Sequence, residues 1–527
     1  QTRTLLRCFT PTIREYYEAR NDLSAEAVTE IEGYLAPKTS NLRATYDSPD
    51  GLFEFTYTTT GGDAVPATDV DPANGIPDRV ERCAEYADYS WHVEIDTLGF
   101  CAPALPTDGT YDVSFASMGA YGYTTLSGYT TRIVLHNTFI GFPPNDDPDG
   151  NALGAAKVTM AHEFKHASQF TNSNWSEGDW VELDATWMED IVFDGCNDYY
   201  NYINQTNGGS QLANPELPLD YGGGGSYEDC LWQHYLSETY GNAIVLDVWD
   251  LRAANSSVTM KNTYQTAQGL YGTEWDESYP KYMEWCWFTG SRAEPPFGFD
   301  EAGRYLRMVL RESPSETYPC RRSDQVDQLA AHARRFNPGA ATGYARVIFN
   351  GDDAHENFTV SVICEEPDGT FSIVQPTLDG NQDCDYTVTQ PWTDLLYVGV
   401  IVTNSRRSGG NQSYTLQVLD DPGGTGVSGS ANANAELLTL LPNRPNPSAG
   451  PTAIRYSVPA PTRGSVRVYD VAGRLIRTLH EGTLPAGRGE IIWDTRNQAG
   501  ELVPAGVYWS RVETERNSAA RKLMLVR

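Results

Sequence analysis

The 527-residue sequence contains no run of 18 apolar residues, so we expect no transmembrane helix. No secretory signal peptide is recognisable, and the chain begins at Gln1 without a methionine. We interpret this as a mature form whose leader has been removed. Basic residues are also scarce, because 38 Lys and Arg stand against 70 Asp and Glu, for a net charge of −32. Nucleic acid is therefore not an expected partner, since phosphate contacts require a basic surface.

None of the nine cysteines forms a CxxC pair, which argues against a zinc site made of several thiolates. Scattered cysteines in a secreted chain indicate disulfides instead. The shortest spacings favour Cys83–Cys101 and Cys364–Cys384, although connectivity does not follow from sequence. The odd number leaves at least one cysteine unpaired within the chain.

The length predicts three or four domains, and the 40% hydrophobic and 11% aromatic content argues for folded structure. Residues 1–335 mix helical patterns with short strands such as 131–135, and we expect one α+β domain there. The predicted helices cover 24–35, 77–95, 153–171, 180–193, 227–239 and 299–311.

From 338 to 420 the pattern changes to β-rich runs separated by Asp, Gly and Asn turns, which predicts a β-sandwich. Residues 421–435 are rich in Gly, Ser, Asn and Ala and predict a flexible linker. The remainder, 436–527, predicts a separate all-β domain. Its residues 438–527 carry 13 Lys and Arg against 7 Asp and Glu, the reverse of the balance elsewhere.

The strongest chemical signal is the segment His162-Glu163-Phe164-Lys165-His166 within an apolar helical pattern. Residues four apart share one helix face, so His162 and His166 can bind one ion. Catalytic zinc takes three protein ligands and leaves a fourth position for water. Glu163 is then placed to act as general base on that water. Lys165 is unusual at its position, and we expect its long side chain to reach solvent.

A third zinc ligand is expected on the helix predicted at 180–193, and Glu182 is our first choice. Glu189, two turns further along the same face, is the main rival. Asp184, Glu189 and Asp190 are also candidates to accept the outer ring N–H of a ligand histidine.

Three aromatic residues are weaker candidates near such a cleft. His234, Tyr235 and Tyr227 are candidates to stabilise an oxyanion, although a buried core role is the favoured interpretation of His234. A thiolate from Cys8 is also able in principle to cap the metal as an inhibitor, but the pattern gives this little support.

A second cofactor candidate is calcium. Carboxylate and amide oxygens recur through Asp69, Asp71, Asn74, Asp78 and Glu81, as in an EF-hand-like loop. The register carries one extra residue between Asp71 and Asn74, and a turn that precedes a helix explains the same residues without an ion.

The tract from about 69 to 195 resembles a family of secreted bacterial metallopeptidases related to a Myxococcus protein. The resemblance rests on Asn74-Gly75-Ile76-Pro77-Asp78, Tyr111-Asp112-Val113, Tyr121-Gly122-Tyr123, the helix around His162–Phe170, and Trp187-Met188-Glu189-Asp190. It implies a gluzincin, a zincin whose third ligand is a glutamate of the second helix. In the family this glutamate stands five residues before the tryptophan, which matches Glu182. Leu183 and Asp184 depart from the small residues and threonine usual after it.

The C-terminal segment resembles the Ig-like sorting domains of type IX secretion and the related flagellar hook-cap type. The matching residues are Pro442–Pro447, Val468–Arg474, Trp493-Asp494, Pro504–Tyr508 and Arg521–Val526. The resemblance implies export, with the secretion machinery or the cell surface as the partner of this domain.

Together these observations predict a multidomain fold: an α+β zincin-like metallopeptidase domain, an all-β sandwich and an Ig-like β domain. The expected function is a secreted or cell-surface zinc endopeptidase acting on protein or peptide substrates. The alternative is a non-catalytic adhesin or filament-forming subunit that retains the zincin fold and self-assembles. Carbohydrate binding by the sandwich is a further, accessory reading.

Overall fold

A computed structural model of the chain describes residues 6–36, 43–178, 180–206, 208–220, 226–295, 297–311, 318–354, 356–423, 439–440, 443–446, 448–458, 461–470, 474–485, 487–514 and 518–526. The chain divides into two compact units. The first comprises Gln1–Asn214, Leu219–His234 and Ala243–Thr273, and the second contains the rest.

A six-stranded mixed sheet organises the first unit, in the order β1-β5-β6-β4-β3-β2. Its strands are β1 (Leu6–Cys8), β2 (Ala44–Asp47), β3 (Phe53–Tyr57), β4 (Tyr111–Ala116), β5 (Ala120–Ser127) and β6 (Thr130–His136). The strand predicted at 131–135 is confirmed as the central strand β6, which is buried along its whole length. β5 runs antiparallel to β6, and the short β1 pairs with β5 in the parallel direction.

Two long helices pack against this sheet, α3 (Asp78–Trp91) and α4 (Asn151–Ser173). Both are helices that the sequence predicts, and α3 continues into a π-helical turn at His92–Thr97. An aromatic core fills the space between sheet and helices, with Phe53 and Tyr111 edge-on to Phe164 of α4. This core fixes the side of α4 that faces the sheet.

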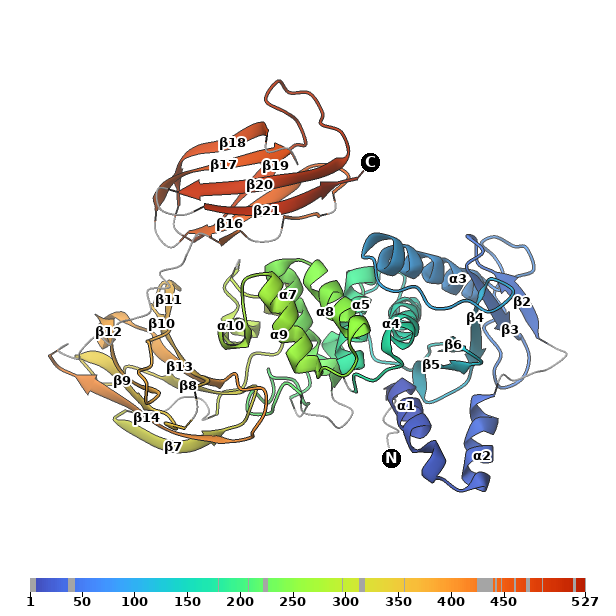
Figure 1. The fold of residues 1–527 in the computed structure, drawn as a ribbon, viewed down its shortest axis with the longest axis horizontal. Coiled ribbons are helices and arrows are strands. Elements are labelled where there is room, and N and C mark those ends of the chain that lie inside the picture. Colours follow the sequence, from blue (N-terminus) through green and yellow to red (C-terminus); the bar gives the residue numbers. More distant parts are fainter. Residues whose placement is uncertain are drawn as a thin grey trace. The chain divides into compact units, whose positions relative to one another are not determined.

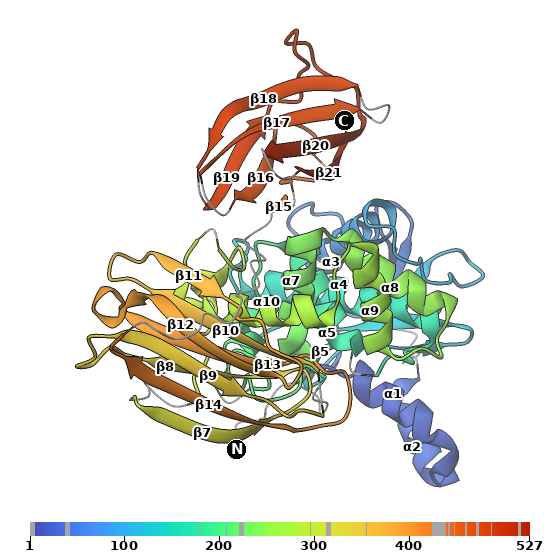
Figure 2. The same cartoon turned by 60° about the vertical axis from the view of Figure 1, so that its left-hand side comes forward.

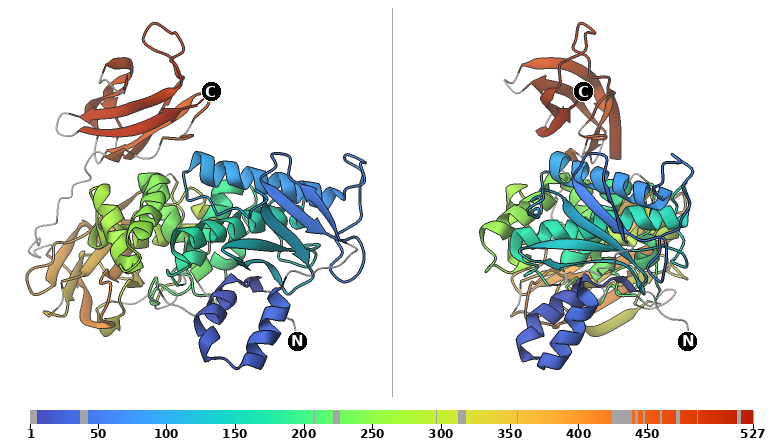
Figure 3. Two further views of the ribbon diagram at one scale, coloured as in Figure 1. Left: turned by 45° about the vertical axis from the view of Figure 1, so that its right-hand side comes forward. Right: turned by 90° about the vertical axis from the view of Figure 1, so that its right-hand side faces the viewer.

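The remaining helices of the first unit cover α4 or extend from the sheet edge. The hairpin of α1 (Thr10–Ala19) and α2 (Ala25–Leu35) follows β1 and is visible in Figures 1 and 3. α5 (Trp180–Phe193) matches its predicted bounds and packs along α4. The others are α6 (Tyr200–Ile203), α8 (Ala243–Ala254) and α9 (Met260–Leu270), and α7 (Cys230–Tyr240) belongs to this unit only up to His234.

The helix predicted at 299–311 is wrong, because only a 3-10 turn at Ala302–Arg304 forms there. The backbone beyond it is extended and bonds to a neighbouring side chain. The Thr289 hydroxyl donates to the Leu306 carbonyl at 2.9 Å and accepts the Met308 N–H at 3.1 Å. These tertiary bonds replace the hydrogen bonds that a helix would have made.

The β-sandwich expected from the sequence is present in the second unit, after α10 (Trp275–Trp287). Its two sheets have the orders β11-β10-β13-β8 and β12-β9-β14-β7 (Figure 2). The strands are β7 (Cys320–Val326), β8 (Ala330–Phe336), β9 (Tyr344–Asn350), β10 (Phe358–Glu365), β11 (Phe371–Val374), β12 (Asp383–Pro391), β13 (Tyr397–Asn404) and β14 (Gln412–Asp421). The predicted start at 338 is therefore too late, since β7 and β8 already belong to the sandwich. Their charged residues concealed the alternation of a strand pattern.

The C-terminal domain contains a second pair of sheets, β15-β16-β19 and β18-β17-β20-β21. Its strands are β15 (Thr439–Leu440), β16 (Thr452–Val458), β17 (Thr462–Asp470), β18 (Leu475–Leu484), β19 (Gly487–Trp493), β20 (Gly506–Thr514) and β21 (Ser518–Leu525). Trp493 lies edge-on to Tyr508 in its core. The linker predicted at 421–435 starts where β14 ends, and its residues 424–435 lie outside the described residues, as do 442, 447 and 471–473.

The predicted disulfides are wrong. All nine cysteines lie in the described ranges, and none is bonded to another. Cys83 is fully buried in the core, where burial raises the pKa of its thiol to about 11, whereas Cys101 is exposed. Cys364 and Cys384 lie on opposite sheets of the sandwich. Closeness in sequence therefore did not translate into the geometry that a disulfide requires.

No helix within the described ranges is long and apolar enough to cross a membrane, in agreement with the sequence.

Free cysteines have a direct solution test. We expect nine reactive thiols per chain when the purified protein is unfolded in denaturant without reductant and titrated with a thiol reagent. Electrophoretic mobility should be the same with and without reductant. A count of seven or five thiols would mean that one or two disulfides form after all.

Candidate metal centre

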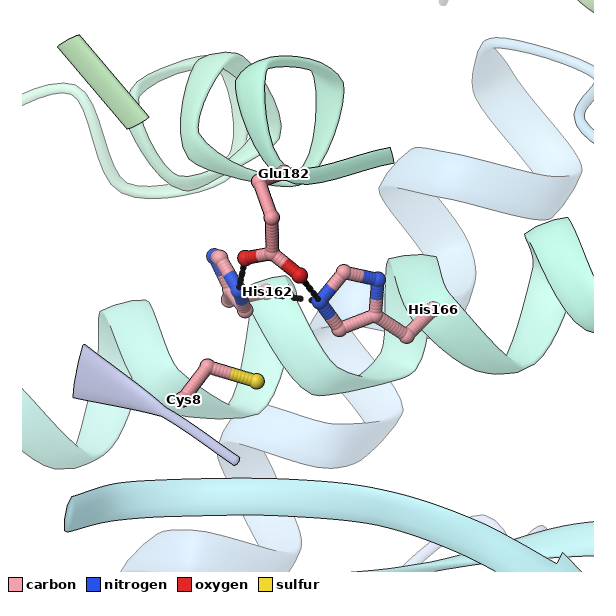
Figure 4. Close-up of side chains that lie close together, drawn as sticks. All are labelled: Cys8, His162, His166 and Glu182. Atoms are coloured by element: carbon pink, nitrogen blue, oxygen red, sulfur yellow. Dashed lines mark hydrogen bonds and ion pairs between the residues drawn. The ribbon is translucent and has the colours of Figure 1, made fainter. Parts of the chain in front are cut away.

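Four side chains that offer metal ligands converge where α4 and α5 pack together (Figure 4). His162 and His166 lie one turn apart on the same face of α4, as their spacing predicts. Glu182 stands in the first turn of α5, opposite both rings. All three are buried, with exposed fractions of 2%, 0% and 2%. The helical period and the approach of α5 therefore bring together the three predicted zinc ligands.

The ligand atoms of these residues face one another at short range. The Nε2 atoms of His162 and His166 are 3.0 Å apart. The two Glu182 carboxylate oxygens lie 3.2 Å from the Nε2 of His162 and 3.1 Å from that of His166. In a tetrahedral zinc site with bonds of about 2.0–2.2 Å, ligand atoms are separated by about 3.3–3.5 Å. The observed cluster is close to that spacing.

The hydrogen-bond partners of the two Nδ1 atoms indicate where the imidazole protons are. His162 Nδ1 lies 2.7 Å from a Glu189 carboxylate oxygen, and His166 Nδ1 lies 2.8 Å from the Gln169 amide oxygen. Both partners are acceptors, so each neutral ring carries its proton on Nδ1. Both Nε2 atoms then present lone pairs to each other and to the Glu182 oxygens, which have no hydrogen-bond donor. A cation resolves this repulsion, and the residues therefore fit a divalent metal ion.

Within the described part of the chain, only one group of three or more His, Cys, Asp or Glu residues has ligand atoms this close together. The sequence-based choice of His162, His166 and Glu182 coincides with three of its members. The fourth is Cys8, and the four ligand atoms lie within 4.8 Å of one another. Figure 4 shows the Cys8 sulfur pointing from β1 toward the space between the histidines and Glu182.

Glu163 lies beside this cluster and is fully buried. One of its carboxylate oxygens accepts hydrogen bonds from the hydroxyls of Thr10, at 3.1 Å, and Thr124, at 2.9 Å. Burial raises the pKa of Glu163 above its ordinary value, against the opposing effect of His166. Such a carboxyl group is suited to accept a proton and give it back.

The predicted supporting carboxylates take different places. Glu189 is the acceptor for His162 rather than a ligand. Asp184 acts one step further out, because it accepts the Gln169 amide N–H at 2.9 Å while Gln169 holds His166. Asp190 lies 3.9 Å from His234.

The structure places the three oxyanion candidates in different surroundings. His234 stacks on Tyr199, and Tyr235 packs against Tyr282 and Trp285. Tyr227 instead stacks on His162, with ring centroids 5.9 Å apart. Tyr227 therefore contacts a ligand of the proposed site.

Sequence reasoning missed three residues that contact the centre. Gln169 was detectable, because it lies three positions after His166 on the same helix face. Thr10 and Thr124 were not, since the packing of α4 on β5 and the pairing of β1 with β5 bring them to Glu163. The approach of Cys8 depends on the same pairing.

Lys165 does not reach solvent, so that expectation is wrong. Its side chain is fully buried, with its ammonium 3.4 Å from Asp184 and over the ring of Phe100. Burial lowers its pKa, against the opposing effects of Asp184 and Glu94. The lysine is thus the counter-ion of the carboxylate behind the His166–Gln169 pair, which explains an otherwise unusual residue in this motif.

The side-chain oxygens of the predicted calcium loop accept hydrogen bonds from groups of the same turn. The Asp69 carboxylate accepts the N–H groups of Asn74 and Gly75, and Asp78 accepts those of Val70 and Asp71. The Asn74 amide donates to Glu81 at 2.8 Å. These bonds correspond to the alternative reading of a turn before a helix, and calcium stays a prediction.

Comparison with known proteins assigns the C-terminal domain. Residues 446–518 match the family profile of the FlgD Ig-like domain. The segment is a small part of the chain, so the match describes that domain and not the centre on α4. No curated protein matches the sequence.

Several solved structures are similar over parts of the chain. PorZ, a surface component of the type IX secretion system of Porphyromonas gingivalis, is 16% identical over 32% of this chain and 23% of its own, with a TM-score of 0.14. Latent PorU from the same organism is 16% identical over 39% and 20%, with a TM-score of 0.16. The adhesin domain of Epf from Streptococcus pyogenes is 9% identical over 38% and 79%, with a TM-score of 0.14. Scores this low carry no argument about function.

Glu189 has a testable role as the partner of a ligand. We expect Glu189→Gln to weaken Zn²⁺ binding about 10-fold or more, because it removes the charge that orients and polarises His162. Competition with a chromophoric chelator measures the affinity. Asp190→Asn, on the same helix but 3.9 Å from His234, is the matched control and should bind zinc like the wild type. Equal losses in both variants would contradict the assignment.

Proposed function

We propose that this protein is a secreted zinc-dependent endopeptidase. The observation that supports this most is the convergence of His162, His166 and Glu182 with Glu163 beside them. Two imidazoles and one carboxylate are the ligand set of several catalytic zinc sites. A buried glutamate next in sequence to the first histidine supplies the acid–base group that hydrolysis needs.

Each residue has a role that follows from its contacts. His162, His166 and Glu182 would hold the ion, while Glu189 and Gln169 keep the two rings in the required orientation. Bound zinc would supply a Lewis acid that polarises the scissile carbonyl and makes an attacking water more acidic.

Glu163 provides the proton transfers of the proposed reaction. Thr10 and Thr124 hold one of its carboxylate oxygens and so fix the direction of the other. In this position Glu163 accepts the proton of the attacking water and then delivers it to the departing amine. The Tyr227 ring, stacked on His162, restricts that imidazole from one face.

We further propose that the C-terminal domain directs export or attachment at the cell surface. Its match to the FlgD Ig-like family and its excess of basic residues support a role separate from the metal centre. The alternative, an adhesin or filament subunit without catalysis, stays a prediction, as does carbohydrate binding by the sandwich.

The proposal is tested by separating metal binding from turnover. We expect one zinc per wild-type chain by elemental analysis and none in His162→Ala. Glu163→Gln should keep the zinc but lose about 10²–10⁴-fold in kcat/KM on a fluorogenic peptide library, since it removes the general base. Cleavage is measured in wild-type and Cys8→Ser backgrounds, because the Cys8 sulfur lies among the ligands.

Glu85→Gln, on the exposed face of α3, is the matched control and should leave both zinc and cleavage unchanged. A wild-type chain without zinc would refute the site. Undiminished cleavage by Glu163→Gln would refute the role of Glu163.

A further inference from the structure

The N-terminal strand occupies the outer edge of β5. Leu6 pairs with Ala120 and Cys8 with Gly122, in the parallel direction, and the Phe9 N–H donates to the Gly122 carbonyl at 3.2 Å. The other edge of β5 is already paired with β6. A sheet edge is the surface on which an extended peptide adds as a further strand. In this form of the chain, β1 fills that edge.

The strand also brings Cys8 to the metal centre. The Cys8 sulfur joins the two histidines and Glu182 in a group whose ligand atoms lie within 4.8 Å of one another. A tetrahedral site with zinc–sulfur bonds of about 2.3 Å separates sulfur and nitrogen ligands by about 3.6 Å. Only a small movement of Cys8 toward the ion is needed.

Two further contacts indicate that this placement is specific. The Thr10 N–H donates to the Cys8 sulfur, at 3.2 Å. The Thr10 hydroxyl donates to Glu163 at 3.1 Å and accepts the Thr124 N–H at 2.8 Å. The same three-residue segment therefore reaches the metal ligands, the general base and β5.

The charges of the four side chains also balance a divalent ion. A thiolate and a carboxylate contribute two negative charges, and the two imidazoles are neutral. All four side chains are buried, where a net charge is costly, so a neutral cluster is favoured.

We infer that Cys8 is the fourth ligand of the metal and that the β1 segment holds the centre closed in this form of the chain. This inference rests on the proposed function, because it describes the regulation of the same site. Cys8 binds as the thiolate, and its proton is released to solvent when the metal binds. Substrate needs the fourth position and the edge of β5, so the β1 segment must leave before hydrolysis.

Few contacts hold this segment beyond Thr10, so its release costs little free energy. Beyond Thr10 it is held by buried Ile13, Arg14 and Tyr16 of α1 and by a bond between the hydroxyls of Tyr17 and Thr125 at 3.3 Å. The Arg132 guanidinium of β6 also donates to the Leu35 carbonyl at the end of α2. The following helix, α2, has no buried residue. Release of the segment therefore exposes the buried side chains of Cys8, Ile13 and Tyr16.

Cobalt substitution tests the ligand directly. Co²⁺ occupies zinc sites, and a thiolate ligand gives it an intense near-ultraviolet charge-transfer band that imidazole and carboxylate do not. We expect this band in the wild type and in Cys101→Ser, whose cysteine is exposed, and its loss in Cys8→Ser. All three chains should still bind one Co²⁺ and show its visible bands. A loaded wild type without the charge-transfer band, or a Cys8→Ser variant that keeps it, would overturn the inference.

Cleavage of the peptide library tests the closure. We expect kcat/KM of zinc-loaded Cys8→Ser to exceed that of wild type by about tenfold or more, because the rate follows the fraction of open sites. Cys101→Ser should match the wild type. Equal Glu163-dependent rates in wild type and Cys8→Ser would overturn the closure. If no loaded variant cleaves any peptide although the band behaves as expected, the proposed function fails with its regulation, while the ligand assignment stands.

Discussion

The approach of Glu182 on α5 to the two histidines of α4 is the interaction on which the centre depends. It places a carboxylate 3.1–3.2 Å from two buried imidazole nitrogens, and a buried charge is stable only with compensation. The proposed metal ion would supply that compensation, while the surrounding side chains hold the two rings: Glu189 for His162, and Gln169 followed by Asp184 and Lys165 for His166. The lysine thus belongs to the chain of contacts that begins at the metal ligands.

A second constraint is the distance between α4 and the sheet, and Gly122 sets it. A Cβ atom at this position would lie 2.8 Å from the Thr159 side chain and 3.3 Å from Cγ of Glu163. The absence of that atom lets α4 approach β5 closely enough for Thr124 to bond to Glu163. The same glycine pairs with Cys8. One small residue therefore lies between the base, the sheet and the closing strand.

The sequence predicted what local periodicity determines. The spacing of His162 and His166 fixed their common face, and the apolar pattern at 180–193 gave α5 with Glu182 in its first turn. Residues whose role depends on distant partners were predicted poorly. Lys165 was expected in solvent because nothing local indicates that Phe100 and Asp184 enclose it. Cys83 and Cys101 are near in sequence, but one lies in the core and the other at the surface. Cys8 reaches the centre only through the pairing of β1 with β5, and the sequence of a three-residue strand does not predict that pairing.

A closed four-ligand zinc site is ordinarily a structural one, so the presence of Cys8 raises the question of which kind this is. Glu163 distinguishes the two. A structural site has no use for a fully buried carboxyl group beside its first histidine, and burying it is costly. Here Thr124 of the sheet and Thr10 of the N-terminal segment both bond to that group. A segment recruited only to complete a structural site would need Cys8 alone. Contact with both the ligands and the base is what an inhibitory segment requires, because it must occupy the metal and the proton acceptor together.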